Sequence, residues 1–409
     1  MPCVPVASIL KSYVNLTLGG APIFLKSMAL KKHLLVSPGP TPVPPQVSLS
    51  GAAPIIHHRT PQFQAIMKEV AENLKYLFCT KNDVLIIPCS GTGVMEAAVS
   101  NLMSPGETMV TVEGGKFGER WSSIGKAFGC ETVPVTVEYG KTVSPKQIEA
   151  VLKQHPKTKA LFIQFSETST GCVYDIEAIA KITKNTNTLL VVDGISAVGA
   201  IPCYPDAWGI DVILTGSQKG LMLPPGLGFI SLNDHAWAAV ETSKCPRFYF
   251  DLNGHRKSLQ AADNLFTPAI SLIVQLREAL KIIREETIEG VWKRHAWLAD
   301  ATRAAATALK LELFAERPGN TVTAMKVPAG LDGGKLVKTM RDELGVTPAG
   351  GQGTMKGKIL RIAHLGYMDR FDILTAVAAL EIALKRQNYS FKAGIGLSAA
   401  QEILCNDPN

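Results

Sequence analysis

Short, continuous runs of apolar residues recur through the first two thirds of the chain, and a polar turn follows most of them. These runs lie at 83–89, 107–113, 159–167, 188–194, 211–217 and 227–232. Runs of this length without polar alternation are typical of parallel strands that are buried on both faces. Helical stretches, such as 63–78 and 93–103, lie between many of the runs. The pattern therefore predicts an α/β fold built on an open, mostly parallel central sheet.

The pattern changes after a helix that begins near Thr267. Long helical stretches, including 370–387, there alternate with shorter apolar segments, which is typical of an α+β unit. We therefore expect a large domain at 51–286 and a smaller C-terminal domain at 287–409. The segment at 28–50 contains "SPGPTPVPP", whose prolines favour extended turns, and it is predicted to be an N-terminal arm.

Residues 1–27 differ from the rest because they contain two lysines and no acid, the first carboxylate of the chain being Glu69. We interpret them as a leader or a targeting extension. The uncharged run at 12–25 is shorter than the roughly 20 residues needed to span a bilayer. The protein is thus expected to be soluble and intracellular, without a membrane partner. It would reside in an organelle (mitochondrion, plastid or peroxisome) if 1–27 is a targeting segment.

Composition excludes some classes of partner. The 409 residues carry a formal net charge of +7, but lysines and arginines alternate with acids, so nucleic acid is not expected as a partner. None of the eight cysteines forms a C-x-x-C pair, so no metal site is predicted from them. An anionic small molecule is the ligand that this charge favours.

The turns after the predicted strands carry the candidate chemistry, because ligands bind at the carboxyl ends of the strands in an open parallel sheet. In "CSGTG" at 89–93, backbone N–H groups and a helix N-terminus would attract a phosphate. The turn does not match a dinucleotide fingerprint, because Glu96 stands where the third glycine or alanine belongs. Capping of the following helix by Ser90 is the alternative interpretation.

Two charged residues lie at the ends of the runs "TLLVVDG" and "LTGSQKG". Asp193 would be a costly buried carboxylate unless it meets a cation or several donors, although capping is the commoner role of a lone aspartate. A partly desolvated Lys219 would have a lowered pKa and could attack a carbonyl, whereas most lysines are surface residues. A phosphate cradle, a buried acid and a lysine in this order match the phosphate, the ring nitrogen and the aldehyde of pyridoxal phosphate.

The ordered motifs "SGTG", "GKFGER", "SETSTG", "VDGISAVGA", "GSQKG" and "PPGLGF" resemble those of the class V, fold-type-I aminotransferases. The chain is similar to the branch that contains serine–glyoxylate and alanine–glyoxylate aminotransferases. It is also similar to cyanobacterial proteins labelled as soluble hydrogenase small subunits. The likeness runs from about His33 to the "AGIGLSAAQ" tail. It implies helices on both faces of the sheet, a pyridoxal 5'-phosphate cofactor and a homodimer.

The resemblance also implies a role for each matched residue at the cofactor site. Lys219 would form the Schiff base with the cofactor, Asp193 would pair with its ring nitrogen, and Phe117 would stack on its ring. Thr168 would hydrogen-bond the phenolic oxygen. The other implied cofactor-binding residues are Ser90, Gly91, Thr92, Ile195, Gln218 and Thr267. The last of these would come from the neighbouring subunit.

On the substrate side, Arg361 in "GKILRIAHLG" would bind the α-carboxylate, because two parallel N–H donors match the plane of a carboxylate. Gly39 in "SPGP" is expected to lie against the substrate. Arg59 and His364 are candidates for contact with the substrate side chain, although lone histidines are more often structural. Asn264 stands where the animal alanine–glyoxylate enzymes have a tyrosine.

The implied reaction is a ping-pong transfer of an amino group from serine or alanine to glyoxylate, with Lys219 as general base. Aspartate as the amino donor is the first alternative. A non-transaminase pyridoxal phosphate lyase or desulfurase is the second, and a desulfurase would need a mobile cysteine such as Cys172 or Cys245. A hydrogenase subunit is disfavoured because it would need clusters of metal-ligating cysteines, which the spacings lack.

Overall fold

The computed structural model of the chain describes residues 31–407. The leader predicted at 1–27 lies outside the described residues, as does the start of the arm predicted at 28–50. Between residues 31 and 407, no helix is both long enough and apolar enough to cross a membrane.

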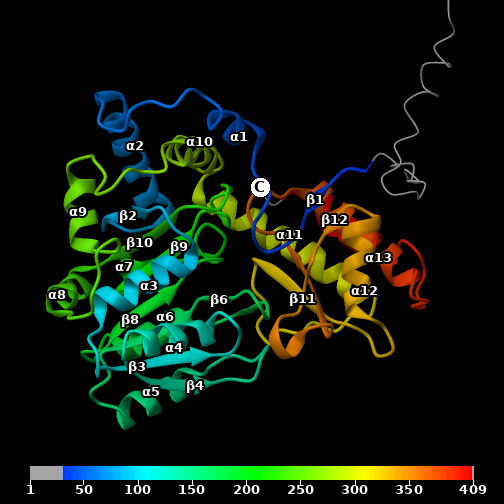
Figure 1. The fold of residues 1–409 in the computed structure, drawn as a ribbon. Helices are drawn as coiled ribbons and strands as arrows, with labels where there is room; N and C mark the ends of the chain where they lie inside the picture. The colour runs from blue at the N-terminus through cyan, green and yellow to red at the C-terminus, as the bar shows by residue number, and fades with distance from the viewer. Residues whose placement is uncertain (1–30, 408–409) are drawn as a thin grey trace, which may run out of the picture. The chain divides into compact units, whose positions relative to one another are not determined.

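A seven-stranded sheet with the strand order β2-β10-β9-β8-β5-β3-β4 forms the centre of the larger part of the structure (Figure 1). Its strands are β2 (Val84–Ile87), β3 (Thr108–Glu113), β4 (Glu131–Thr136), β5 (Ala160–Gln164), β8 (Leu189–Asp193), β9 (Val212–Gly216) and β10 (Gly228–Leu232). Neighbouring strands are parallel except at β10, which runs antiparallel to both β9 and β2. The predicted α/β fold with a mostly parallel central sheet is confirmed.

Helices cover both faces of this sheet (Figure 1). The helices of this part of the structure are α1 (Pro45–Ser50), which packs on α10, and α2 (Pro61–Phe78), α3 (Gly91–Leu102), α4 (Gly118–Ala127), α5 (Pro145–Gln154), α6 (Ile176–Thr183), α7 (Pro205–Trp208), α8 (Asp234–Thr242), α9 (Leu252–Gln260) and α10 (Ile270–Glu286). In β5, Leu161 and Ile163 join a core with α2, α5, α6 and α10, whereas Phe162 joins a second core with α3, α4 and α8. Because successive residues of a strand face opposite sides, burial of both faces requires the continuous apolar runs seen in the sequence.

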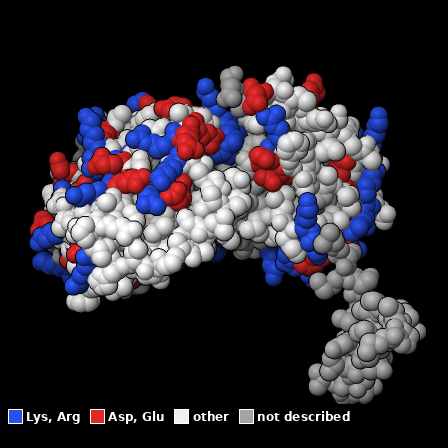
Figure 2. Space-filling view, turned by 90° about the horizontal axis from the view of Figure 1, so that it is seen from above, with Lys and Arg blue, Asp and Glu red and all other residues white. Residues whose placement is uncertain are grey.

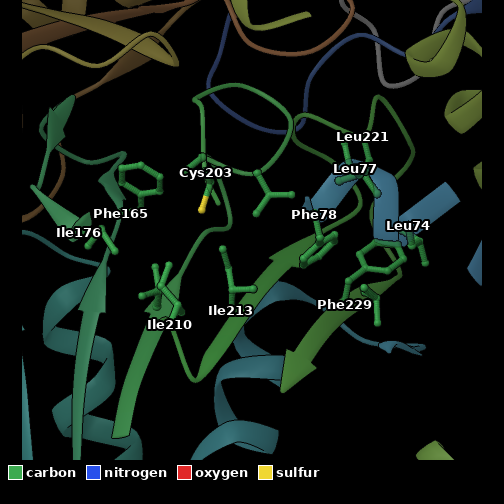
Figure 3. Close-up of a cluster of buried hydrophobic side chains, with 14 of the residues drawn as sticks. Leu74, Leu77, Phe78, Phe165, Ile176, Cys203, Ile210, Ile213, Leu221 and Phe229 are labelled. Atoms are coloured by element: carbon green, nitrogen blue, oxygen red, sulfur yellow. The ribbon is translucent and has the colours of Figure 1, made fainter. Parts of the chain in front are cut away.

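One of these cores also supports the loop that follows β9 (Figure 3). Leu77 and Phe78 of α2 pack in the same cluster as Phe229 of β10. Leu221, two residues beyond Lys219, joins this cluster and is fully buried. Burial of apolar surface therefore anchors the loop that carries the lysine.

The elements after Thr287 have their own sheet and their own core. They are α11 (Ile288–Ala308), β11 (Val322–Lys326), α12 (Gly333–Lys338), the π-helix η2 (Thr339–Glu343), β12 (Val346–Thr347), β13 (Ala349–Gly350), the 3-10 helix η3 (Gly353–Met355), β14 (Ile359–Ala363), α13 (Arg370–Lys385) and α14 (Ile395–Leu404). The sheet has the order β11-β14-β13 and is antiparallel. A separate cluster of buried side chains joins it to the surrounding helices. The exact boundary near residue 286 stays a prediction.

The N-terminal arm connects this smaller sheet to the loop after β9. It begins with β1 (Leu34–Leu35), which pairs in parallel with β12. Val36 O then accepts a hydrogen bond of 2.8 Å from Ala363 N at the end of β14. Further along, Thr41 Oγ1 donates to Lys219 O over 3.1 Å. The arm residues between these attachments are thereby held beside the lysine.

Three local features differ from the predicted pattern. The strand β4 was not predicted because Pro134 interrupts it, but β4 is an edge strand, where proline is tolerated. The apolar run at 159–167 is not one strand, since β5 ends at Gln164 and the short β6 (Ser166–Glu167) pairs with β7 (Cys172–Val173). One of the helical stretches of the C-terminal part is not regular, since α12 continues directly into the π-helix η2.

Charged side chains of both signs are mixed on the face shown in Figure 2. Lysines and arginines lie beside acids there and do not gather into a patch of one sign. Ion pairs on the helices follow the same pattern, since Lys153 pairs with Glu149 and Lys181 with Glu177. The interleaved charges of the sequence are therefore also interleaved on this surface.

Candidate active site

The turns at the carboxyl ends of β2, β3, β8 and β9 meet at one cavity on the edge of the central sheet. The cavity is lined by Ser90, Gly91, Thr92, Phe117, Arg120, Ser166, Thr168, Asp193, Ile195, Gln218 and Lys219. It therefore brings together every residue that was predicted for the cofactor site except Thr267.

Lys219 lies in the loop that joins β9 to β10, and only 8% of the residue is exposed. Its Nζ donates a hydrogen bond to the carbonyl oxygen of Pro38 in the arm. The pKa of Lys219 is lowered to about 8, chiefly by burial; the charge of Asp193 opposes this shift, and the charges of Arg361 and Arg120 add to it. More of this amine is therefore neutral near pH 7 than of a surface lysine, as a nucleophilic amine requires.

Asp193 is the last residue of β8, and only 4% of it is exposed. Its Oδ1 accepts a hydrogen bond of 2.8 Å from Ile195 N. Burial raises the pKa of Asp193 to about 7; the Ile195 N–H group opposes this shift and the charge of Glu167 adds to it. A cation placed in the cavity, such as a protonated ring nitrogen, would stabilise this carboxylate.

The turn from β2 into α3 supplies hydrogen-bond donors to one end of the cavity. Ser90 is the N-cap residue of α3, but its side chain makes no capping hydrogen bond, so its alternative role as a plain helix cap is not supported. Gly91 and Thr92 begin the helix, where backbone N–H groups lack partners within the helix. Gln218 Oε1 is buried and has no hydrogen-bond partner. The free N–H groups are available to an anion at the helix N-terminus, whereas the Gln218 oxygen is an acceptor and would need a donor from the ligand.

Phe117 and Thr168 form further parts of the cavity wall. The turn that carries Phe117 is held by Glu167, which accepts hydrogen bonds from the N–H groups of Phe117 and Gly118 over 3.5 and 3.0 Å. Thr168 Oγ1 lies 2.7 Å from Ser196 Oγ. Both residues thus border the cavity, as expected for residues that contact a cofactor ring.

Arg361 lies on β14, behind the cavity wall, and only 3% of it is exposed. Its Nη1 donates to Thr168 O over 2.6 Å, and its Nε and Nη2 donate to Gly350 O over 3.1 and 2.7 Å. Burial lowers the pKa of Arg361 to about 10, so the guanidinium remains charged at neutral pH. The backbone around Thr168 therefore links this cation to the cavity.

Besides Gly39 and Arg361, three other residues that were considered for the site do not line this cavity. Thr267 is exposed, so its contribution to a neighbouring subunit stays a prediction. Arg59 is exposed in the turn before α2. His364 is fully buried, and its ring nitrogens lie 3.0 Å from Thr323 Oγ1 and 2.8 Å from Asn320 O. Burial lowers the pKa of His364 to about 3, so it is a neutral residue with a structural role.

Two charged residues of the site were not predicted. Arg120 lines the cavity, and Glu167 is fully buried behind the turn of Phe117. Burial raises the pKa of Glu167, and the surrounding N–H groups oppose this shift. Arg120 belongs to the motif "GKFGER" and Glu167 to "SETSTG", but a motif does not give the direction of a side chain. The spacing of Arg120 three residues after Phe117 is the one available signal, because it places both side chains on one side of a helical turn.

The cavity has matching groups for each polar part of one cofactor. A buried amine suits an aldehyde, a buried carboxylate suits a protonated ring nitrogen, and free N–H groups of a helix suit a phosphate. On a mostly parallel sheet with a smaller C-terminal unit, these groups define a pyridoxal phosphate enzyme of fold type I.

The comparisons with known proteins give the family. The Aminotransferase class-V family matches residues 35–369, and the chain belongs to this family. The soluble hydrogenase 42 kDa subunit of Anabaena cylindrica is 40% identical to it, over 92% of this chain and 99% of that protein. The serine–glyoxylate aminotransferase of Methylorubrum extorquens is 33% identical, over 92% of this chain and 97% of that protein. The ureidoglycine–glyoxylate aminotransferase structure from Bacillus subtilis has a TM-score of 0.88 at 28% identity, and the match covers 93% of this chain and 100% of that chain. The cofactor of this enzyme class is pyridoxal 5'-phosphate.

Replacing Gly39 is expected to disturb Lys219 directly. A Cβ at Gly39 would overlap the Nζ of Lys219, and the φ of +135° at this position is one that other residues rarely adopt. We expect Gly39→Ala to slow the uptake of pyridoxal phosphate by the apo-protein by about tenfold or more, since a strain of about 1–3 kcal/mol falls on the arm beside the lysine. Uptake is measured through the absorbance of the bound cofactor.

Gly330→Ala is the matched control, because Gly330 also has a positive φ (+84°) but a Cβ there would meet nothing within 4 Å. Equal effects of both variants would refute the prediction.

The buried carboxylate of Asp193 is expected to make the stability of the apo-protein depend on pH. Its pKa is raised from 3.8 to about 7 in the folded state, so its favourable contribution is complete below about pH 4 and is lost as the pH rises through 7. Asp193→Asn should therefore be more stable than the wild-type apo-protein at pH 8, by about 1–4 kcal/mol, and should lose this advantage near pH 4. Urea unfolding at both pH values measures the difference, and an advantage that does not change with pH would contradict it.

Proposed function

We propose that this aminotransferase transfers the amino group of a small amino acid, serine or alanine, to glyoxylate. The observation that carries the proposal is the pair of buried, oppositely charged groups of Lys219 and Asp193 at one cavity, with Arg361 behind its wall. Glyoxylate as the acceptor is supported by the comparisons, because the Methylorubrum relative and the Bacillus structure are both named as glyoxylate aminotransferases.

Lys219 is proposed to move the proton of the reaction. Bound pyridoxal phosphate supplies a carbonyl that takes up the amino group and a ring that withdraws electrons from the α-carbon of the substrate. With its pKa lowered to about 8, Lys219 can remove the α-proton as a neutral amine near neutral pH and return a proton as an ammonium. The carbonyl of Pro38, which accepts a hydrogen bond from Nζ, gives the free amine a fixed position. Asp193 would hold a proton at the ring nitrogen of the bound cofactor, because a buried carboxylate stabilises a cation beside it.

Arg361 is proposed to bind the α-carboxylate of the donor and the carboxylate of glyoxylate. A guanidinium has five N–H donors. Its hydrogen bonds to Gly350 O and Thr168 O use one donor on Nε, one on Nη1 and one on Nη2. One N–H group therefore remains on each terminal nitrogen, which is the number that bidentate binding of a carboxylate requires.

A donor without a second carboxylate is supported by the charges around the cavity. Among the residues that line it, Arg120 is the one arginine, and it is bonded to Thr92 at the end where α3 begins. Arg59, which would favour aspartate if it faced the substrate, is exposed outside the cavity of its own chain. Serine and alanine need no cation beyond Arg361.

The desulfurase alternative is not supported by the positions of the candidate cysteines. Cys172 is fully buried, with its Sγ 3.6 Å from Gly140 O. Cys245 is buried with its Sγ 3.9 Å from Phe128 O. Neither lines the cavity, so neither is placed to attack a substrate there.

We also propose that the enzyme works as a homodimer in which Thr267 completes the phosphate site of the neighbouring subunit. The surface beside this residue suits a contact between subunits. Phe248 is 81% exposed, and its ring centroid lies 5.6 Å from that of Phe266. Exposed aromatic side chains at one place on a surface are typical of an interface.

A panel of amino donors tests the proposed reaction. Serine, alanine and aspartate are each assayed with glyoxylate by measuring glycine formation, and we expect kcat/KM for serine or alanine to exceed that for aspartate about tenfold or more, with ping-pong kinetics. Lys219→Ala should lower kcat by about a thousandfold or more, because the base is lost. Lys153→Ala, a change to a lysine that is 73% exposed, is the control. Turnover confined to aspartate would reject the choice of donor, and absence of glycine formation from any donor would reject the reaction.

Replacing the proposed carboxylate clamp should weaken the binding of both substrates. Lysine keeps the positive charge but has no pair of parallel N–H donors for bidentate binding of a carboxylate. We therefore expect Arg361→Lys to raise KM for the donor and for glyoxylate by about 10–100-fold. Arg341→Lys is the control, since the side chain of Arg341 is 48% exposed. Steady-state kinetics with each substrate varied in turn measure the effect. A loss confined to kcat, with both KM values unchanged, would contradict the assignment.

A further inference from the structure

Arg120 is the cation of the cavity to which no ligand has been assigned. It lies in the first turn of α4, and its Nη1 donates a hydrogen bond of 3.0 Å to Thr92 Oγ1. Its guanidinium carbon lies 5.0 Å from the centroid of the Phe117 ring. Two contacts thus fix its position, one from α3 and one from the aromatic residue of its own turn.

The acid next to Arg120 in sequence does not neutralise it. Glu119 forms an ion pair with Lys116 and accepts a hydrogen bond from Tyr139. Among residues 31 to 407, no carboxylate forms an ion pair with Arg120, although, against the larger effect of burial, its charge lowers the pKa of Asp193 in the same cavity. One of its five N–H donors is used by Thr92, and the other four make no hydrogen bond to the described residues.

The contact with Thr92 places this charge at the end of the cavity where α3 begins. The N-terminus of α3 carries a partial positive charge, and its first N–H groups point outward, as in other anion sites. A phosphate monoester has a charge of about −1.5 to −2 at pH 7 and several acceptor oxygens. A partly buried arginine with spare donors beside such a helix end complements a phosphate in charge and in hydrogen bonding.

We propose that Arg120 is a ligand of the cofactor's phosphate group, positioned by Thr92 and by the ring of Phe117. It would supply the full positive charge that the backbone donors of Ser90, Gly91 and Thr92 lack. This inference rests on the pyridoxal phosphate cofactor of the family and is independent of the proposed amino donor.

Two other roles of Arg120 predict different results. It could bind the side-chain carboxylate of an acidic donor, which would make it a specificity residue. It could otherwise only support the ring of Phe117, without touching the phosphate. A pair of cofactor forms, one with the phosphate and one without, separates these roles.

The test compares the binding of pyridoxal phosphate and of pyridoxal, which lacks the phosphate, to the apo-protein. Dissociation constants are measured by absorbance titration for the wild type, Arg120→Gln and Arg120→Lys. We expect Arg120→Gln to weaken pyridoxal phosphate binding by about 10–100-fold while pyridoxal binding changes less than about twofold. Arg120→Lys, which keeps the charge, should bind pyridoxal phosphate with an affinity between those of the wild type and the glutamine variant.

Lys116→Gln is the matched control, because Lys116 is a cation on the same turn whose side chain is 42% exposed and paired with Glu119. It should leave both dissociation constants unchanged.

Equal losses for pyridoxal and pyridoxal phosphate in Arg120→Gln would show that Arg120 only supports the ring, and the proposal would fail. Unchanged cofactor binding together with a raised KM for aspartate alone would assign Arg120 to the substrate and would also overturn it. If Arg120→Gln does not fold, the ratio of the two affinities in Arg120→Lys decides, since a loss specific to pyridoxal phosphate is expected only for a phosphate ligand. Failure of the donor panel would leave these binding results unaffected.

Discussion

The removal of two opposite charges from water is the constraint on which this site depends. Lys219 and Asp193 are both buried at the carboxyl edge of the central sheet. Burial lowers the pKa of the amine to about 8 and raises the pKa of the carboxyl group to about 7. Both groups are thus moved toward neutral pH, where each can gain or lose a proton at low cost. A surface lysine and a surface aspartate would not have this property.

The rest of the fold keeps these two groups in place. The strands that carry them are buried on both faces, so the sheet edge is fixed by two cores. The arm adds a third support, because it is hydrogen-bonded to β14 at one end and to the backbone of Lys219 at the other. Since Arg361 also lies on β14, a single short segment connects the proposed carboxylate clamp with the lysine. A shift of the smaller sheet would therefore move Pro38, whose carbonyl oxygen accepts the hydrogen bond of the amine.

The sequence predicts the part of the fold that depends on periodicity. Continuous apolar runs gave the strands that carry Asp193 and Lys219, since a strand buried on two faces has no other composition. The order of polar turns then predicted which residues meet at the strand ends. The direction of β10 could not be read in this way, because an apolar run has the same pattern in either direction. The edge strand β4 was not predicted, because it is only partly buried, so its residues are less uniformly apolar, and because Pro134 interrupts it.

The parts of the site that were missed depend on side-chain direction. Arg120 and Glu167 stand in quoted motifs, yet only three-dimensional packing shows that one lines the cavity and the other holds the turn of Phe117. His364 was considered as a contact of the substrate side chain, and it directly follows β14, which ends at Ala363. Its ring nitrogens instead lie beside Thr323 Oγ1 and Asn320 O, a direction that the sequence pattern does not give. Thr267 could not be placed from one chain, because its predicted partner belongs to another subunit.

The reversed strand β10 has a mechanical consequence for the lysine. A parallel strand in its place would require a crossover connection of about a dozen or more residues, usually with a helix. The lysine would then lie at the start of this long connection. Because β10 runs back directly, the chain from Ser217 to Leu227 is a closed loop. Ser217 N donates to Leu227 O over 2.9 Å, and Leu227 N donates to Ser217 Oγ over 3.2 Å, so the loop is clamped at its base. The reactive amine is thus carried by a short, closed loop between two neighbouring strands. An insertion in this loop would be far less tolerated than an insertion in an ordinary surface loop.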